Sequence, residues 1–208
     1  MLELQRKGAH NINLVTPTHY MPGILEALSI AYENKLDVPL VYNTNGYDSI
    51  ELLRLLEGVI DIYMPDMKYF DKSTAKKFSN ADNYPEAAME GIREMYRQVG
   101  NLKVNEDDVA YKGLLVRHLV LPGNVEDSKK VIEFLSGISK DLVVSIMSQY
   151  SPQYKACEHP EINRKLTKEE YWEVIRKVQE SGLQDYLIQE MDSSEVYLPD
   201  FDKDEPFK

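Results

Sequence analysis

Short apolar runs alternate with longer amphipathic stretches along this chain, and that alternation is the strongest constraint on its fold. The apolar runs have the length of strands, and apolar residues recur with helical spacing between them. The runs lie at 11–16, 39–44, 59–70, 114–121, 142–147 and 186–189. Strands that alternate with helices build βαβ units with right-handed crossovers, so the sequence predicts an α/β fold with a parallel sheet and outer helices.

The number of strands limits the architecture further. Six strands are too few for a closed eight-stranded barrel, so a partial barrel and an open sheet both fit. Helices are predicted at 2–7, 24–34, 50–56, 71–80, 84–99, 125–139 and 168–181, and loops at 17–23 and 101–112. Asp48 or Ser49 is expected to cap the third helix, and Thr167 with Glu170 forms a capping-box pattern before the last.

Composition bounds the class of protein. The 208 residues suffice for one large domain, which we place at 1–190, followed by an acidic tail at 191–208. The net charge of -11 argues against nucleic acid and anionic membranes as partners. The single cysteine, Cys157, excludes an internal disulfide, and together with the absence of a signal peptide it indicates a cytoplasmic protein.

The stretch 59–70 carries the clearest functional signal. The period of two along a strand places Ile60, Ile62, Met64, Asp66 and Lys68 on one face, which begins apolar and ends in an acid and a base. Ligands bind beyond the carboxyl ends of parallel strands, so this pattern predicts a site at that end. The alternative is that the two charged residues form a solvated ion pair on the surface.

Polar residues also follow the other predicted strands. They are Thr16, Thr18, His19, Asn43, Thr44, Asn45, Arg117, His118, Ser148, Gln149 and Tyr150. Together they suit a small zwitterion or a carboxylate. Lys68 and Arg117 can hold a carboxylate, while Asp66 with the side-chain oxygens at 43 and 44 can hold an ammonium group or a small hard cation.

Two histidines and the cysteine allow other interpretations. Arg117 and His118 are adjacent in a strand and therefore point to opposite faces, so we assign Arg117 to the site and interpret His118 as a buried structural residue. Cys157 and His159 are two potential metal ligands without further partners at a set spacing, which is a weak metal signal.

Four segments, at 11–20, 39–47, 61–69 and 117–123, resemble the radical S-adenosylmethionine enzymes, in the branch related to pyruvate formate-lyase activating enzyme. The resemblance extends from about Leu4 to Glu190. It implies a partial (βα)6 TIM-like barrel. It also implies a [4Fe-4S] cluster on a CxxxCxxC motif and S-adenosylmethionine bound to the cluster. Reductive cleavage then yields a 5′-deoxyadenosyl radical, which abstracts hydrogen from a protein, forming a glycyl radical, or from another substrate.

The resemblance also implies which residues contact the cofactor. By position in the motifs, S-adenosylmethionine contacts are expected at Thr18, His19, Asn43, Thr44, Met64, Asp66, Lys68, Arg117 and Gln149. The turn that carries Thr18 and His19 stands where the family has a Gly-Gly-Glu turn, and Asn43 replaces an acidic residue. No catalytic side chain and no metal ligand is assigned.

The chain departs from the family in its cysteines. It contains no CxxxCxxC motif, and one thiolate cannot hold a cubane cluster. The first strand of the family fold is also missing before Met1. We therefore expect the C-terminal part of a radical enzyme, inactive by itself: a truncated piece, a gene start placed too far downstream, or a degenerate relative. The alternative is a cluster-free binding module for a small zwitterion or a protein partner.

Overall fold

The computed structural model describes residues 1–191, and the acidic tail predicted at 191–208 lies beyond them except for Met191. Seven strands form one sheet in the order β1-β2-β3-β5-β6-β7, with every neighbouring pair on this path parallel and with β4 antiparallel to β5. The strands are β1 Ile12–Val15, β2 Leu40–Thr44, β3 Ile62–Pro65, β4 Lys103–Val104, β5 Ala110–Leu119, β6 Val143–Met147 and β7 Tyr186–Ile188. The predicted α/β fold with a parallel sheet is confirmed.

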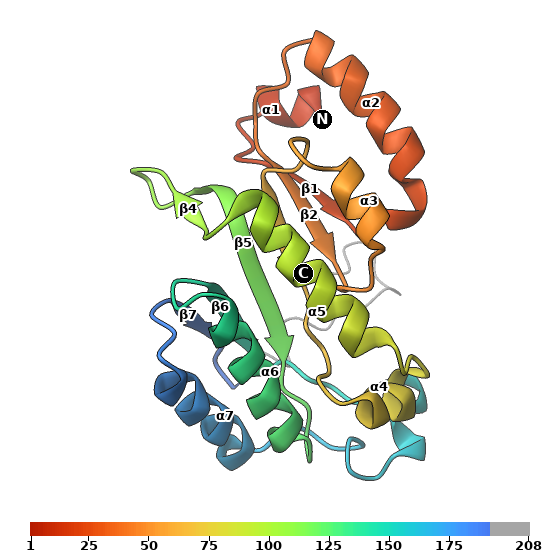
Figure 1. Ribbon diagram of the computed structural model, residues 1–208, viewed down its shortest axis with the longest axis vertical. Coiled ribbons are helices and arrows are strands. Elements are labelled where there is room, and N and C mark those ends of the chain that lie inside the picture. Colours follow the sequence, from red (N-terminus) through yellow and green to blue (C-terminus); the bar gives the residue numbers. More distant parts are fainter. Residues whose placement is uncertain (192–208) are drawn as a thin grey trace.

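The helices follow the predicted alternation closely. They are α1 Leu2–Arg6, α2 Met21–Glu33, α3 Ile50–Leu55, α4 Lys72–Ser79, α5 Tyr84–Val99, α6 Val125–Ile138 and α7 Lys168–Ser181, with short 3-10 turns η1 Pro17–Tyr20 and η2 Tyr154–Glu158. Figure 1 shows α5 crossing in front of the sheet, with α2 and α3 beside it and α6 and α7 over the other half. No helix among residues 1–191 is long and apolar enough to cross a membrane.

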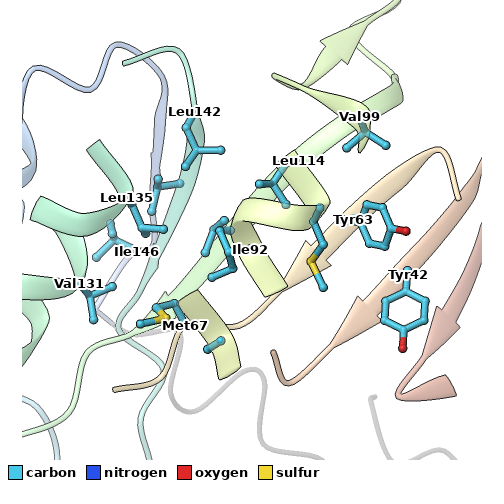
Figure 2. Close-up of a cluster of buried hydrophobic side chains, with 14 of the residues drawn as sticks. Tyr42, Tyr63, Met67, Ile92, Val99, Leu114, Val131, Leu135, Leu142 and Ile146 are labelled. Carbon is cyan, nitrogen blue, oxygen red and sulfur yellow. The ribbon is translucent and has the colours of Figure 1, made fainter. Parts of the chain in front are cut away.

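The hydrophobic core lies between the sheet and this helical layer. Alternate strand residues such as Tyr42, Tyr63 and Leu114 are fully buried, and Ile92 of α5 belongs to the same cluster of buried side chains (Figure 2). The other set of strand side chains is less covered, and Val15 keeps 65% of its surface exposed. One face of the sheet is therefore packed, and the other remains accessible.

The prediction of one continuous strand from 59 to 70 is wrong in its length. β3 ends at Pro65, and the ladder to β5 resumes only where the Met67 amide donates to the Arg117 carbonyl (2.8 Å). Pro65 has no N–H to donate at the rung two residues earlier, so it interrupts the ladder. Residues 66–71 therefore continue the chain direction without belonging to a regular strand.

Two predicted loops also contain regular structure. Within 101–112, β4 and the start of β5 form a hairpin, because the Asn105 side chain accepts hydrogen bonds from the Asp107 and Val109 amides at its tip. Within 17–23, a 3-10 turn leads directly into α2. Neither segment has apolar periodicity, and local side-chain hydrogen bonds of this kind give no such periodic signal.

The start of α7 shows how local sequence signals become tertiary contacts. The predicted capping box is present, with the Thr167 side chain accepting from the Glu170 amide and the Glu170 carboxylate accepting from the Thr167 amide. The same carboxylate accepts from Arg164 (2.6 and 2.8 Å) and from the Gly123 amide (2.7 Å) in the loop after β5. Glu170 thus ties α7 to the carboxyl end of the sheet.

We expect Glu170→Gln to lower the free energy of unfolding by about 1–3 kcal/mol at pH 7, the scale of lost charge-assisted hydrogen bonds. The Arg164 guanidinium lowers the pKa of Glu170 to about 2, below its unfolded value. The stabilisation is therefore present above about pH 4.5 and is lost as the pH falls towards 2. Urea denaturation of both proteins at pH 7, 5 and 3 measures this. Glu169→Gln, at an exposed neighbour, is the control; an equal loss at pH 3 and pH 7 contradicts the assignment.

Candidate functional site

Four polar side chains meet at the carboxyl ends of β2, β3 and β5, and we call Asn43, Asp66, Lys68 and Arg117 the polar cluster. The parallel register brings them together, because Asn43 pairs with Met64 and Asp66 pairs with Arg117 across neighbouring strands. Their side chains project from the less covered face of the sheet.

Asp66 lies at the centre of the polar cluster. Its carboxylate accepts hydrogen bonds from Lys68 Nζ (2.7 Å) and from Arg117 Nε (2.9 Å), and Arg117 Nη2 also donates to Asn43 Oδ1 (2.8 Å). The Asp66 side chain is only 15% exposed, against 25% for Arg117 and 39% for Lys68. Partial burial makes these contacts stronger than those of a solvated surface pair.

The polar cluster has hydrogen-bonding capacity to spare. It carries a net charge of about +1, from two cations and one carboxylate. Within residues 1–191 no hydrogen bond occupies Arg117 Nη1 or Asn43 Nδ2, and only one of the three Lys68 ammonium donors is used. Free donors beside a central carboxylate suit a ligand with a carboxylate and an ammonium group. Met64 lies beside Asn43 in register and adds an apolar contact surface.

Thr18 and Thr44 do not join the polar cluster. Asn43 and Thr44 are adjacent in β2, so they point to opposite faces, and Thr44 is 2% exposed on the helix side. The hydroxyls of Thr18 and Thr44 donate to the carboxylate of Asp48 at 2.9 and 2.5 Å. The prediction that the Thr44 side-chain oxygen faces the same ligand as Asn43 is corrected by this geometry.

Asp48 was expected only as an alternative helix cap, and its role is different. Ser49 caps α3 by accepting from the Leu52 amide (3.2 Å). Asp48 is instead buried, and besides the two threonines it accepts from the Tyr42 hydroxyl (2.8 Å). Burial, and then the Asp48 charge, raises the pKa of Tyr42, so this tyrosine stays protonated and serves as a donor.

Within residues 1–191, His19 and Gln149 make no hydrogen bond to the polar cluster. His19 is exposed in η1 and contacts the Tyr20 ring edge-on, with ring centroids 5.9 Å apart. Gln149 accepts a hydrogen bond from Gln189 Nε2 (2.7 Å) after β7. The residue between β1 and η1 is more informative: Thr16 has a left-handed backbone (φ 48°) and its amide donates to the Asn43 carbonyl. Such a conformation is strained for a β-branched residue, and strain of this kind gathers at functional sites.

His118 lies on the opposite face from Arg117, as the strand period predicts. Its Nδ1 is 2.7 Å from the Met67 carbonyl, so this nitrogen carries the proton and donates. Burial lowers the pKa of His118 to about 4, which keeps the ring neutral at pH 7. His118 therefore supports the backbone behind the polar cluster and does not face a ligand.

The described residues offer no metal centre. Among residues 1–191 no group of three or more histidine, cysteine, aspartate and glutamate side chains could hold a metal ion. Cys157 is exposed in η2, and its thiol donates to the Tyr154 carbonyl at 3.6 Å. An iron–sulfur cluster needs several thiolates, so this part of the chain does not fit one.

Two residues near the polar cluster were not anticipated from the sequence. Ser145 of β6 pairs in register with Arg117 and shares its face, as the alternation of Val143, Ser145 and Met147 would have indicated. Tyr84, at the start of α5, reaches the backbone of the segment that carries Asp66 and Lys68. No local sequence pattern marks that long-range contact.

No family model matches the chain. The uncharacterized protein MJ0674 of Methanocaldococcus jannaschii is 31% identical over 186 residues, which cover 88% of this chain; the chain spans half the length of that relative. A crystal structure of a domain of pyruvate-formate lyase-activating enzyme from Bacteroides vulgatus superposes with a TM-score of 0.61 at 14% identity, covering 86% of this chain and 98% of that domain. The chain therefore shares the α/β fold of an activating-enzyme domain.

The turn after β2 packs closely against the backbone of Asp66 at Gly46, and the variant Gly46→Ala tests this close approach. Gly46 has φ +82°, and a Cβ there would lie 2.2 Å from the Asp66 carbonyl oxygen. We expect a loss of at least ~2 kcal/mol in unfolding free energy, from left-handed strain and steric overlap. Gly23→Ala in α2, where a Cβ meets nothing within 4 Å, should instead be neutral or stabilising. Urea denaturation of both variants decides this, and equal stabilities would contradict the close approach.

Proposed function

We propose that this chain is the C-terminal part of a radical S-adenosylmethionine enzyme related to the activating enzymes, and that the polar cluster binds the methionine end of S-adenosylmethionine. The observation that supports this most directly is the set of free donors around Asp66, at the carboxyl ends of parallel strands. Ligands bind at that end in α/β folds. The structural likeness to an activating-enzyme domain supports the fold alone, and the polar cluster adds the chemistry.

Each residue of the polar cluster has a role in the proposal. The ammonium of Lys68 and the unused Nη1 of Arg117 take the ligand carboxylate, and Asp66 takes its ammonium group. Asn43 supplies an amide that can donate to the carboxylate, while its oxygen holds the guanidinium of Arg117 in place. The described residues thus bind and orient the amino-acid end of the ligand.

The resemblance implies a [4Fe-4S] cluster, but the proposal places no ligand of that cluster in this chain. The sequence has one cysteine, and the described residues contain no ligand set for a cluster. We therefore derive no electron-transfer step from these residues. In the proposal, reductive cleavage and hydrogen abstraction, from a protein partner or another substrate, belong to the parent enzyme.

The single cysteine also favours a second function, that of a binding module without an iron–sulfur cluster. A cluster-free module with this polar cluster can bind a small zwitterion without any radical chemistry. Methionine, S-adenosylmethionine and S-adenosylhomocysteine separate the two proposals as probes. A module for a simple zwitterion binds methionine as tightly as S-adenosylmethionine, whereas a remnant of the cofactor site prefers the adenosyl compounds.

We expect Lys68→Ala and Asp66→Ala each to weaken binding of S-adenosylmethionine by ~1.5–3 kcal/mol, the scale of a lost hydrogen bond to a charged group. The melting temperature of Lys68→Ala should change little, because the Lys68 side chain is 39% exposed, whereas Asp66→Ala also removes the carboxylate that pairs with Arg117 and should lower it moderately. Calorimetric titration with S-adenosylmethionine measures the affinities, and Lys76→Ala, at an exposed position of α4, is the control. Unchanged affinity in both variants with a large fall in melting temperature would make the pair structural.

Anaerobic reconstitution with iron and sulfide should yield no [4Fe-4S] cluster in this chain, because one thiolate cannot replace three. The absorption spectrum in the region of thiolate-to-iron charge transfer checks this, together with iron and sulfide analysis. Cys157→Ala is the matched variant. If Cys157→Ala still forms a stoichiometric [4Fe-4S] cluster, the proposal that the cysteine ligands belong to another part of the parent enzyme is wrong.

A further inference from the structure

The segment that carries Asp66 and Lys68 has two sheet bonds at its start, from the Asp66 amide to the Thr44 carbonyl (2.9 Å) and from the Met67 amide to the Arg117 carbonyl (2.8 Å), and beyond them it is held by side chains. Residues 66–71 lie between the end of β3 and the start of α4, outside any regular strand. Three buried side chains from other elements hydrogen-bond to their backbone: Tyr84 of α5, His118 of β5 and Asp127 of α6, which are 4%, 1% and 6% exposed. Buried backbone groups must find such partners.

Tyr84 makes the contacts nearest the polar cluster. Its hydroxyl accepts from the Lys68 amide (2.9 Å) and lies within hydrogen-bond distance of the carbonyls of Asn45 (2.9 Å) and Asp66 (3.0 Å). A hydroxyl has one proton to donate and can accept as well, so it serves one carbonyl at a time while accepting from Lys68. One oxygen atom therefore links the turn after β2 to the backbone on both sides of Met67.

The Tyr84 ring is fixed in position. It packs between Tyr47 and Tyr69, with ring centroids 5.8 and 5.7 Å away. Burial raises the pKa of Tyr84, so the hydroxyl keeps its proton at neutral pH. Gly46 allows the close approach on the other side, since its ideal Cβ position lies 3.2 Å from the Tyr84 hydroxyl as well as 2.2 Å from the Asp66 carbonyl oxygen.

His118 and Asp127 act on neighbouring positions. His118 Nδ1 donates to the Met67 carbonyl (2.7 Å), and the Asp127 carboxylate accepts from the Phe70 and Asp71 amides (3.0 and 2.7 Å). These bonds hold the middle and the end of the segment. Among the three, only Tyr84 touches the backbone of Asp66 and Lys68 themselves.

We propose that Tyr84 is a positioning residue for ligand binding at the polar cluster, because its hydroxyl holds Lys68 in register with Asp66 and with the β2 turn. This inference rests on the proposed function, in which Lys68 binds the ligand carboxylate. Lys68 is the most exposed charged member of the polar cluster and its side chain has several rotatable bonds. The Lys68 ammonium bonds to Asp66 (2.7 Å), and holding the Lys68 backbone limits the other positions that the ammonium can reach.

Tyr84→Phe tests the proposal, because it removes the hydroxyl and keeps the ring packing. The matched control is Tyr63→Phe: Tyr63 is also fully buried, but its hydroxyl donates to Gln98 Oε1 (2.7 Å), away from the segment 66–71. In Tyr84→Phe we expect faster hydrogen exchange at the Lys68 amide and no comparable change at Phe70. We also expect binding of S-adenosylmethionine to weaken by about 3- to 10-fold. Tyr63→Phe should leave both unchanged.

A double-mutant cycle with Lys68→Ala separates positioning from general destabilisation. If Tyr84 acts through Lys68, its effect on affinity should disappear in the Lys68→Ala background, whereas independent effects add. Additive losses, or unchanged exchange and affinity in Tyr84→Phe while Lys68→Ala still weakens binding, would overturn the positioning role and leave the proposed function standing. Unchanged affinity in Lys68→Ala itself would refute the proposed function, and with it the role of Tyr84 in binding.

Discussion

The pairing of Asp66 with Arg117 joins the two halves of the sheet at the point where the site forms. Pro65 interrupts the ladder between β3 and β5, and the Met67 amide restores it by donating to the Arg117 carbonyl. The same two residues that meet through the backbone bridge also meet through their charged side chains. β3 and β5 also pair at Ile62–Gly113 and Tyr63–Leu114, so the Asp66–Arg117 contact extends the sheet past Pro65 and sets the geometry of the polar cluster. A change in register at β5 would disturb both.

The packing of the sheet explains why polar groups are tolerated at this contact. Helices cover one face, and buried side chains there, such as Tyr42 and Leu114, form the core. The other face is only partly covered, so the charges of Asp66 and Arg117 avoid the full cost of desolvation while remaining strong enough to order each other. Full exposure would weaken the pair and full burial would leave a third charge, that of Lys68, uncompensated.

Sequence reasoning predicted most helices and strands because they depend on local periodicity, whereas the end of β3 at Pro65 was missed because the apolar pattern continues past the proline. The period of two separated Arg117 from His118, and the structure places them on opposite faces. The same rule applied to Asn43 and Thr44 shows that only one of them can face outward. Both were assigned to the site because both carry a side-chain oxygen, and their opposite directions in the strand were overlooked. Asp48 and Tyr84 could not be predicted in this way, because their partners are backbone and hydroxyl groups brought close only by the tertiary fold.

Side-chain support of the segment 66–71 has a consequence for how such a site can change. A ladder ties every residue of a strand to the stability of the sheet, so a shift in one position strains the rest. Beyond the sheet bonds of the Asp66 and Met67 amides, this segment depends on separate contacts from Tyr84, His118 and Asp127, which belong to three elements. Tyr84 belongs to the buried core, so its ring has to be kept, but the hydroxyl that bonds to the Lys68 amide can be removed while the ring packing stays. The position of Lys68 can thus be adjusted independently of the fold, and a binding site of this construction can be retained, retuned or lost while the α/β sheet persists.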